Sequence, residues 1–264
     1  MGSLSREVSV AARAAARGAD VVRTAGLEAR AAVRAKDLPG DYVTEVDVEA
    51  ERAITSFLEA EGFGVGVHGE ESGGVDVADA WVVDPLDGTT NFTRGFWAVG
   101  VSVALVQEGR PVAGAISAPF MDETWVAGRG EGAWRLAGDD RARLAVSDRS
   151  RAQAVVGTGF PFRRKDLVPR YLRAFDAAFS RFEDLRRPGA ACLDLAWVAA
   201  GVFDGFFELG LGPWDVAAGG LLIEEAGGVV TDWSGGDGWL SGDILAGGAA
   251  VHGALLEVSA ASRG

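Results

Sequence analysis

Residues 81–93 constrain this chain more than any other segment, because they join a buried strand to metal-binding and phosphate-binding groups. The apolar run 81–83 predicts a buried strand, and it ends in two aspartates, Asp84 and Asp87. Gly88 and Thr89 follow at once. Carboxylate oxygens bind hard cations, and backbone N–H groups at a turn or helix start bind phosphate. The segment therefore favours metal-assisted phosphoryl chemistry.

The composition indicates a globular protein with a sizeable core and an acidic surface. The 264 residues are 48% hydrophobic, and 38 are glycine, about twice ordinary usage, which predicts many tight turns. The formal net charge of −13 lacks the positive footprint that nucleic-acid binding requires. The short basic run 163–165 predicts a solvated loop. The length predicts one compact unit of two halves, which we place at 1–145 and 146–264.

The sequence predicts a cytoplasmic protein without a membrane partner. Cys192 is the only cysteine, so no internal disulfide can form, and a reducing compartment fits. No apolar stretch reaches the roughly 18 residues of a membrane span. Residues 1–36 lack the apolar core of a signal peptide, and their pattern predicts an amphipathic packing helix.

The rest of the chain predicts mixed sheets layered with helices. Short β-like runs separated by glycine turns predict an antiparallel meander over residues 97–136, and the polar stretch 138–150 predicts a weak boundary. Helices are predicted at 44–61, 167–179, 190–200, 213–226 and the C-terminus. The other predicted strands are 65–67, 154–157, 203–209, 228–231 and 244–246.

Four acidic residues from separate segments form a predicted metal site. Glu70 lies in a glycine-flanked turn, Asp84 and Asp87 end the buried strand, and Asp215 lies in the first turn of a predicted helix. Two ionised carboxylates about 5 Å apart repel by roughly 3 kcal/mol at an effective dielectric near 20. Four such groups would need divalent cations between them or partial protonation. An all-oxygen set selects Mg²⁺, Mn²⁺ or Ca²⁺ over zinc.

Each of these residues also has a purely structural interpretation. Asp87 with Gly88 is typical of a turn, and Glu70 alone predicts a solvated turn residue. Asp215 alone is a first-turn charge that complements the helix dipole. Asp47 alone completes a capping box at the start of its helix. The metal-site hypothesis therefore depends on the combination.

Five segments together carry a specific motif. They are Gly69-Glu70-Glu71-Ser72, Asp84-Pro85-Leu86-Asp87-Gly88-Thr89-Thr90-Asn91-Phe92, Gly189-Ala190-Ala191-Cys192-Leu193-Asp194-Leu195-Ala196, Phe206-Phe207-Glu208 and Pro213-Trp214-Asp215-Val216-Ala217-Ala218-Gly219. In this order and spacing, which covers nearly the whole chain, they resemble the inositol monophosphatase family. The resemblance implies a layered α/β fold, the αβαβα sandwich of the inositol monophosphatase and sugar phosphatase type. It also implies Mg²⁺-dependent hydrolysis of a phosphate monoester, lithium sensitivity and a homodimer.

The resemblance assigns metal ligands to matching positions. Glu70, Asp84 and the carbonyl oxygen of Leu86 would hold a first Mg²⁺. Asp84, Asp87 and Asp215 would hold a second, and a third, weaker ion would share Glu70. Mn²⁺ is the expected substitute.

The resemblance also assigns catalytic and substrate contacts. Glu70 and Thr89 would orient the attacking water, and Asp47 would hydrogen-bond Thr89. Lys36 would lie near the metals, with a solvated surface lysine as the alternative. The implied substrate contacts are Asp87, Gly88, Thr89, Ala191, Glu208 and Asp215.

Two positions near the implied leaving group need separate comment. Family members often carry Ser or Thr where this chain has Ala190, which removes one polyol contact and bears on inositol more than on phosphatase activity. Cys192 is predicted to be a small buried residue rather than a nucleophile.

Two other motifs are weaker. Residues 64–69 match G-x-G-x-x-G, but a dinucleotide loop needs a strand before it and a helix after it, whereas here a helix precedes and a Glu-Glu-Ser turn follows. Asp87-Gly88-Thr89 also occurs in haloacid-dehalogenase-type phosphatases, which need a nucleophilic aspartate where this chain has Pro85.

We therefore expect a Mg²⁺-dependent phosphatase acting on a small phosphate ester, with inositol monophosphate as the first candidate. Histidinol phosphate, fructose 1,6-bisphosphate and 3′-phosphoadenosine phosphates stay open, although residues 90–92 are more similar to the inositol branch. An alternative of another class is a regulatory or binding protein on a phosphatase scaffold.

Overall fold

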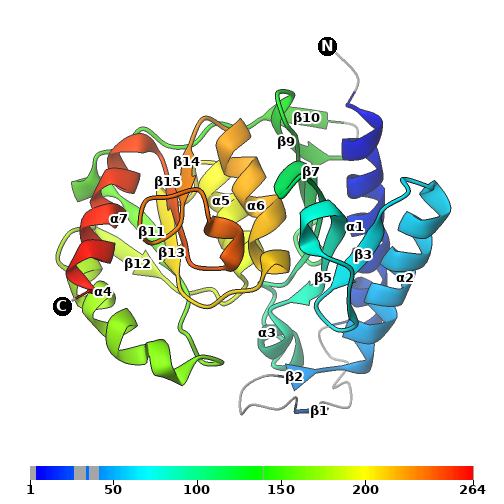
Figure 1. The fold of residues 1–264 in the computed structure, drawn as a ribbon, viewed down its shortest axis with the longest axis horizontal. Helices are drawn as coiled ribbons and strands as arrows, with labels where there is room; N and C mark the ends of the chain where they lie inside the picture. The colour runs from blue at the N-terminus through cyan, green and yellow to red at the C-terminus, as the bar shows by residue number, and fades with distance from the viewer. Residues whose placement is uncertain (1–3, 27–33, 36–41, 139, 264) are drawn as a thin grey trace.

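The chain folds into five alternating layers of helices and sheets (Figure 1). The computed structural model describes residues 4–26, 34–35, 42–138 and 140–263. Two helices cover the outside of a first sheet, two lie between the sheets, and two cover the outside of a second sheet. In that order they are α1 (Arg6–Ala25), α2 (Glu45–Glu61), α5 (Ala191–Ala199), α6 (Pro213–Glu225), α4 (Val168–Phe179) and α7 (Ala249–Ala261). The predicted αβαβα sandwich is confirmed.

The first sheet contains the predicted meander. Its strands are β3 (Gly66–Gly69), β4 (Gly73–Gly74), β5 (Ala80–Asp87), β6 (Gly100–Gln107), β7 (Arg110–Ala118), β8 (Glu123–Gly128), β9 (Gly132–Ala137) and β10 (Asp140–Arg143). They lie in the order β10-β9-β8-β7-β6-β5-β3-β4, and all neighbours are antiparallel except the parallel pair of β3 and β5. The meander prediction is confirmed by β6 to β9.

The second sheet has mixed strand directions. Its strands are β11 (Val155–Thr158), β12 (Asp184–Arg186), β13 (Gly205–Glu208), β14 (Val229–Thr231) and β15 (Ile244–Gly247). They lie in the order β12-β11-β13-β15-β14, with β11 parallel to both of its neighbours and the other pairs antiparallel. The remaining elements are β1 (Arg34–Ala35), β2 (Tyr42–Val43), α3 (Thr89–Thr93) and 3₁₀ turns at Val77–Asp79, Arg151–Gln153, Lys165–Leu167 and Trp239–Ser241.

Strand β5 is apolar at successive positions because both of its faces are covered. Trp81 and Val83 belong to the hydrophobic cluster formed with α1 and α2, whereas Ala80 and Val82 belong to the cluster formed with α5 and α6. Successive side chains of a strand point to opposite faces, so a strand between two helix layers must bury every residue. The predicted buried strand is confirmed.

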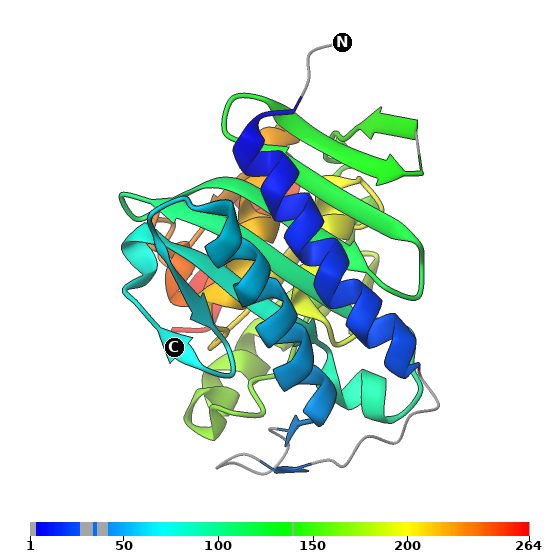
Figure 2. The same cartoon turned by 90° about the vertical axis from the view of Figure 1, so that its right-hand side faces the viewer.

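The middle helices are buried nearly all round, since each faces a sheet on both sides. All nine residues of α5 are buried, as are nine residues of α6. The outer helices instead have one apolar face, and Figure 2 shows α1 and α2 lying side by side across the first sheet. A polar face opposite an apolar one is typical of helices at a surface.

Several local features differ from the predictions. The helix predicted for residues 1–36 ends at Ala25, where Gly26 adopts a φ of 73°, and Arg34–Ala35 form a strand. The edge strand β10 lies in the polar stretch from residue 138, where the sequence predicted no strand, and the weak boundary predicted there stays a prediction. Strand β12 has the polar sequence Asp-Leu-Arg, which gives no periodic signal.

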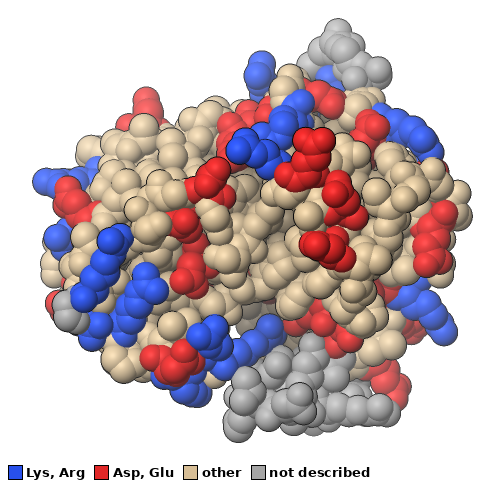
Figure 3. Space-filling view, in the orientation of Figure 1, with Lys and Arg blue, Asp and Glu red and all other residues tan. Residues whose placement is uncertain are grey.

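The two sheets do not cross the predicted division of the chain. The first spans residues 66–143 and the second spans residues 155–247. The boundary at residue 145 itself stays a prediction. Acidic and basic side chains are interspersed over the described part of the face in Figure 3. No helix in the described part of the chain combines the length and apolar character that a membrane crossing requires.

The layered core predicts a strong contrast between two leucines. Leu195 on α5 is fully buried between the sheets, whereas Leu172 on α4 is 56% exposed. We expect Leu195→Ala to lower the free energy of unfolding by about 2–5 kcal/mol, and the control Leu172→Ala by less than about 0.5 kcal/mol. Urea unfolding measures both. Equal losses for the two variants would contradict the burial of α5 between two sheets.

Candidate active site

A β-bulge brings Asp84 and Asp87 to the same side of the first sheet. In the pairing with β6, Asp84 lies opposite Ser102 and Asp87 opposite Gly100, so β5 has one extra residue at this point. Residues three apart on a regular strand point to opposite faces, and the extra residue of a bulge corrects this. Pro85 lies within the bulge and needs no ladder partner for a backbone N–H.

Three carboxylates converge from two elements of the fold. One oxygen each from Asp84, Asp87 and Asp215 lies within 4.8 Å of the others. Asp215 comes from the first turn of α6, where its Oδ2 accepts a hydrogen bond of 2.6 Å from Gly212 N–H. Asp215 therefore stabilises the start of α6 and also belongs to the carboxylate cluster.

The other two aspartates are also oriented by backbone donors. Asp84 Oδ1 accepts a hydrogen bond of 3.0 Å from Leu86 N–H, and Asp87 Oδ2 accepts one of 2.7 Å from Cys192 N–H at the start of α5. Asp84 Oδ2 is buried and has no hydrogen-bond partner among the described residues. A buried carboxylate oxygen without a partner is costly, so this atom marks a place for a cation or a proton.

Burial and mutual repulsion raise the pKa values of the three acids. Burial is the largest cause for each. The pKa of Asp87 rises to about 6 and that of Asp215 to about 8, and the charges of Asp87 and Glu70 contribute to the rise at Asp215. The pKa of Asp84 lies well above its usual range, with Glu70 as the next cause after burial.

Glu70 lies beside the three-aspartate cluster and is paired with an arginine. It follows β3, and its backbone N–H donates to Val83 O at 3.0 Å. Its Oε1 lies 3.3 Å from Arg163 Nη1. The carboxylate of Glu51 accepts hydrogen bonds from Glu71 N–H and Ser72 N–H, which fixes the turn that contains Glu70.

The hydroxyl of Thr89 connects α2 to the end of β5. Thr89 Oγ1 lies 3.0 Å from Asp47 Oδ1 and 3.1 Å from Leu86 O. Asp47 Oδ2 accepts a hydrogen bond from Thr44 N–H in a capping box at the start of α2. The two interpretations of Asp47, capping and support of Thr89, therefore hold together.

Gly88 allows the chain to turn from the strand into α3. It has a φ of 89°, in the left-handed region that favours glycine, and it is the N-cap residue of α3. The first N–H groups of a helix have no partner within the helix, so those of Gly88 and Thr89 stand at a place suited to an anion.

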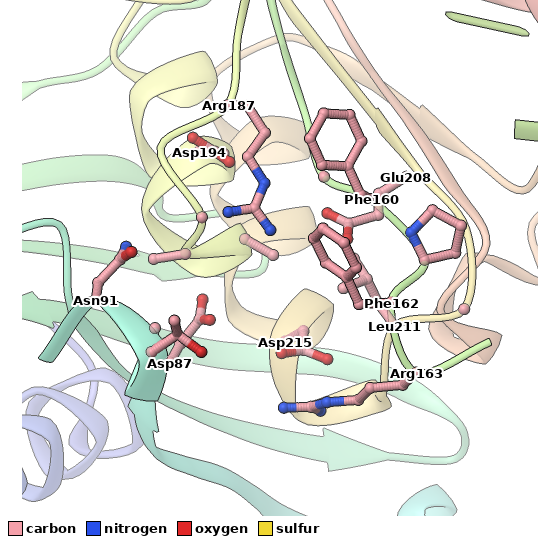
Figure 4. A pocket seen from close by; sticks show the side chains of 18 of the residues that line it. Asp87, Asn91, Phe160, Phe162, Arg163, Arg187, Asp194, Glu208, Leu211 and Asp215 are labelled. Carbon is pink, nitrogen blue, oxygen red and sulfur yellow. The ribbon is translucent and has the colours of Figure 1, made fainter. Parts of the chain in front are cut away.

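A cavity of about 320 Å³ opens beside these residues (Figure 4). All six predicted substrate contacts line it, and Asp194, Arg163 and Arg187 line it as well. Glu208 is buried on β13, and burial raises its pKa well above the usual range. Lys36, the remaining predicted site residue, lies outside the described residues.

Arg163, Arg187 and Asp194 are site residues that the sequence did not indicate. Arg163 lies in the exposed loop that the sequence predicted, and its side chain, 44% exposed, also pairs with Glu70 at the cavity. Asp194 has a buried Oδ1 without a hydrogen-bond partner among the described residues. An acidic residue within an otherwise apolar helix was the sequence signal that could have indicated it. Cys192 is fully buried, and burial raises the pKa of its thiol, so it is not a thiolate nucleophile.

The donor set fits Mg²⁺. Three carboxylates with oxygens within 4.8 Å of one another, one of them carrying an unpartnered buried oxygen, match the all-oxygen coordination of that ion. A divalent cation also removes the repulsion that raises the three pKa values.

Comparison with known proteins identifies the family. The model of the inositol monophosphatase family matches residues 4–263. The chain belongs to the inositol monophosphatase family. Members of this family are phosphatases that generally use Mg²⁺, and this chain is accordingly a phosphatase.

The relatives of this protein are named either as inositol monophosphatases or as SuhB proteins. An Inositol-1-monophosphatase of Mesorhizobium japonicum is 44% identical over 224 residues, 83% of each chain. A Nus factor SuhB of Salmonella typhimurium is 39% identical over 258 residues, 94% of each chain. Among solved structures, extragenic suppressor protein suhB from Bartonella henselae is 38% identical with a TM-score of 0.89, covering 97% of this chain and 98% of that one. An inositol monophosphatase from Anabaena is 32% identical with a TM-score of 0.81, covering 96% and 94%.

The raised pKa values predict that the metal-free protein is less stable at pH 8 than at pH 5. Between the ordinary aspartate value of 3.8 and the folded values of about 6 and about 8, the unfolded chain loses protons that the folded chain keeps. The free energy of unfolding therefore falls over this window, by a few kcal/mol at about 1.4 kcal/mol per pKa unit. Urea unfolding in EDTA at several pH values measures the fall, and Mg²⁺ should restore more stability at pH 8 than at pH 5.

A matched pair of variants tests the cause of this pH dependence. Asp215→Asn removes one buried titrating group and should flatten the curve, whereas Asp237→Asn, whose side chain is 93% exposed, should leave it unchanged. A wild-type curve that rises from pH 5 to pH 8 would refute the assignment of the raised pKa values.

Proposed function

We propose that this protein hydrolyses a small phosphate monoester, first of all inositol monophosphate, in a reaction that depends on Mg²⁺. The single observation that carries the proposal is the convergence of Asp84, Asp87 and Asp215 beside the start of α3, at a cavity large enough for a small ligand. We further propose a cytoplasmic homodimer that is inhibited by lithium, as the family resemblance implies.

The predicted metal ligands retain their proposed roles. Glu70, Asp84 and the carbonyl oxygen of Leu86 would hold one Mg²⁺, and Asp84, Asp87 and Asp215 a second. A third ion would share Glu70, and Mn²⁺ would substitute. Such ions supply a water of lowered pKa and neutralise charge on the phosphoryl oxygens.

The side chains around this centre bind and orient the reactants. The N–H groups of Gly88 and Thr89 hold the phosphoryl oxygens, since a helix start favours anions. Thr89, held by Asp47, orients the attacking water together with Glu70. Glu70 Oε1 is paired with Arg163, and the carboxylate has a second oxygen that can take this role.

The leaving group would occupy the same cavity. Asp87, Ala191 and Glu208 line it, and their polar groups would contact the hydroxyls of the leaving group. Ala190 offers no hydroxyl at a position where relatives often have one. Histidinol phosphate, fructose 1,6-bisphosphate and 3′-phosphoadenosine phosphates therefore stay as alternative substrates for the same chemistry.

Replacement of Asp87 should abolish this activity. Asp87→Asn removes a carboxylate shared by the metal and substrate contacts, and we expect phosphate release from inositol 1-phosphate to fall by at least about a hundredfold. Asp237→Asn is the control, since that side chain is 93% exposed. Initial rates with Mg²⁺ and with excess EDTA measure the effect. Full wild-type activity in EDTA would refute the metal mechanism.

A second candidate function is regulatory. The relatives named Nus factor SuhB align with 82% to 94% of this chain, and that name describes a factor rather than a hydrolase. We infer that a regulatory or binding role on the same scaffold is the alternative of another class.

Genetic complementation separates the two functions. If catalysis is the cellular role, a strain whose own copy is deleted should recover with the wild-type gene and not with Asp87→Asn. Recovery with Asp87→Asn, in a variant shown to lack phosphatase activity in vitro, would favour the regulatory role.

A further inference from the structure

Arg187 presents an oriented cation to the cavity beside the catalytic carboxylates. It lies in the segment between β12 and α5, and it lines the cavity together with Asp87 and Asp215 (Figure 4). None of the proposed steps of phosphate hydrolysis uses this side chain, so its presence needs another explanation.

The guanidinium of Arg187 lies against two aromatic rings and close to Gly189. Its Cζ lies 5.2 Å from the ring centre of Phe160 and 5.5 Å from that of Phe162. Phe160 is anchored in turn by an edge-on contact with Tyr171 at 5.6 Å. A side chain on Gly189 would come within 2.6 Å of Arg187 Nη1, so the glycine leaves room for this placement. The arginine is therefore pre-organised rather than freely rotating.

The hydrogen-bonding capacity of this guanidinium is unused. It makes neither a hydrogen bond nor an ion pair with any residue that the structure describes. Its neighbour Arg186, in contrast, is paired with Asp184 and does not line the cavity. A guanidinium has five N–H donors in a planar fork that matches a phosphate or a carboxylate.

The groups around Arg187 leave space for an anion. Asp194 and Glu208 line the same cavity, and the charge of Arg187 acts on both. Burial raises the pKa of both carboxyls, and the charge of Arg187 opposes this rise. The cavity of about 320 Å³ lies at the lower end of the range for small-molecule sites, and a ligand held at the aspartate cluster would fill much of it.

We propose that Arg187 binds a second anionic group of the substrate, a phosphate or a carboxylate distinct from the phosphate that is hydrolysed. This inference rests on the proposed phosphatase function and narrows its substrate class. It ranks small bisphosphates and phosphorylated acids above inositol monophosphate, the substrate proposed first, because a polyol monophosphate has no second anionic group for the guanidinium.

Two pairs of substrates that differ in the second group test this proposal. Glucose 1,6-bisphosphate is compared with glucose 1-phosphate, and 3-phosphoglycerate with glycerol 3-phosphate, by initial rates of phosphate release with Mg²⁺. The wild-type protein should have a higher kcat/KM for the substrate that carries two anionic groups in at least one pair. The pair that shows the preference identifies the second group as phosphate or carboxylate.

Three variants assign the preference to Arg187. Arg187→Ala should lower kcat/KM for the preferred substrate with two anionic groups by about ten- to a hundredfold. For the paired substrate with one anionic group, kcat/KM should change by less than about threefold. Arg187→Lys should keep part of the preference, since it retains the charge and loses the fork. Arg186→Ala, the matched control, should keep all of it.

The outcomes separate this inference from the proposed function. The role of Arg187 is overturned if the wild type hydrolyses both substrates of each pair without a preference. It is also overturned if Arg187→Ala lowers kcat/KM equally for both substrates. Either result leaves the phosphatase function standing. No Mg²⁺-dependent release from any substrate, inositol 1-phosphate included, overturns the proposed function. Thermal shifts then decide the binding role, because 3-phosphoglycerate should raise the Tm of the wild type more than that of Arg187→Ala.

Discussion

The repulsion among three carboxylates within 4.8 Å of one another is the constraint on which the rest of this structure depends. Folding must bring Asp84, Asp87 and Asp215 together although burial and neighbouring charges disfavour their ionised forms. Each carboxylate accepts a hydrogen bond from a backbone N–H, those of Leu86, Cys192 and Gly212. These donors come from rigid elements, so they orient the acids without neutralising them and leave the remaining charge to a bound cation.

The five-layer architecture follows from the same requirement. Helices α5 and α6 lie between the two sheets, and both begin at the site. The start of α5 provides the N–H that binds Asp87, and the start of α6 provides Asp215 itself. Because a helix buried on all sides can shift only if both sheets shift, the distances among the three acids are fixed by the densest part of the core. The same two helices therefore form the core between the sheets and position the groups of the site.

Much of the fold and the metal cluster could be predicted, since both are encoded in local patterns. The uninterrupted apolar run before Asp84 predicted a buried strand, and the acids at its end and after Pro213 predicted the cluster. Edge strands such as β12 were missed because their stability comes from pairing rather than from a periodic sequence. Arg163 and Arg187 were missed because an exposed arginine in a loop has the same local sequence whether it faces solvent or a cavity. Only the packing of Phe160 and Gly189 around Arg187 distinguishes the two.

The cations of the cavity complete the electrostatic argument. A chain with a net charge of −13 that binds an anionic substrate must supply positive charge locally. A divalent ion at the three aspartates would do this for the scissile phosphate, and Arg163 is paired with Glu70 nearby. Neither of these charges needs Arg187, which lies against aromatic rings in the cavity wall. A cation that is oriented but makes no ion pair strengthens binding most when the ligand itself carries the matching charge, so substrate selection is the role that its position explains.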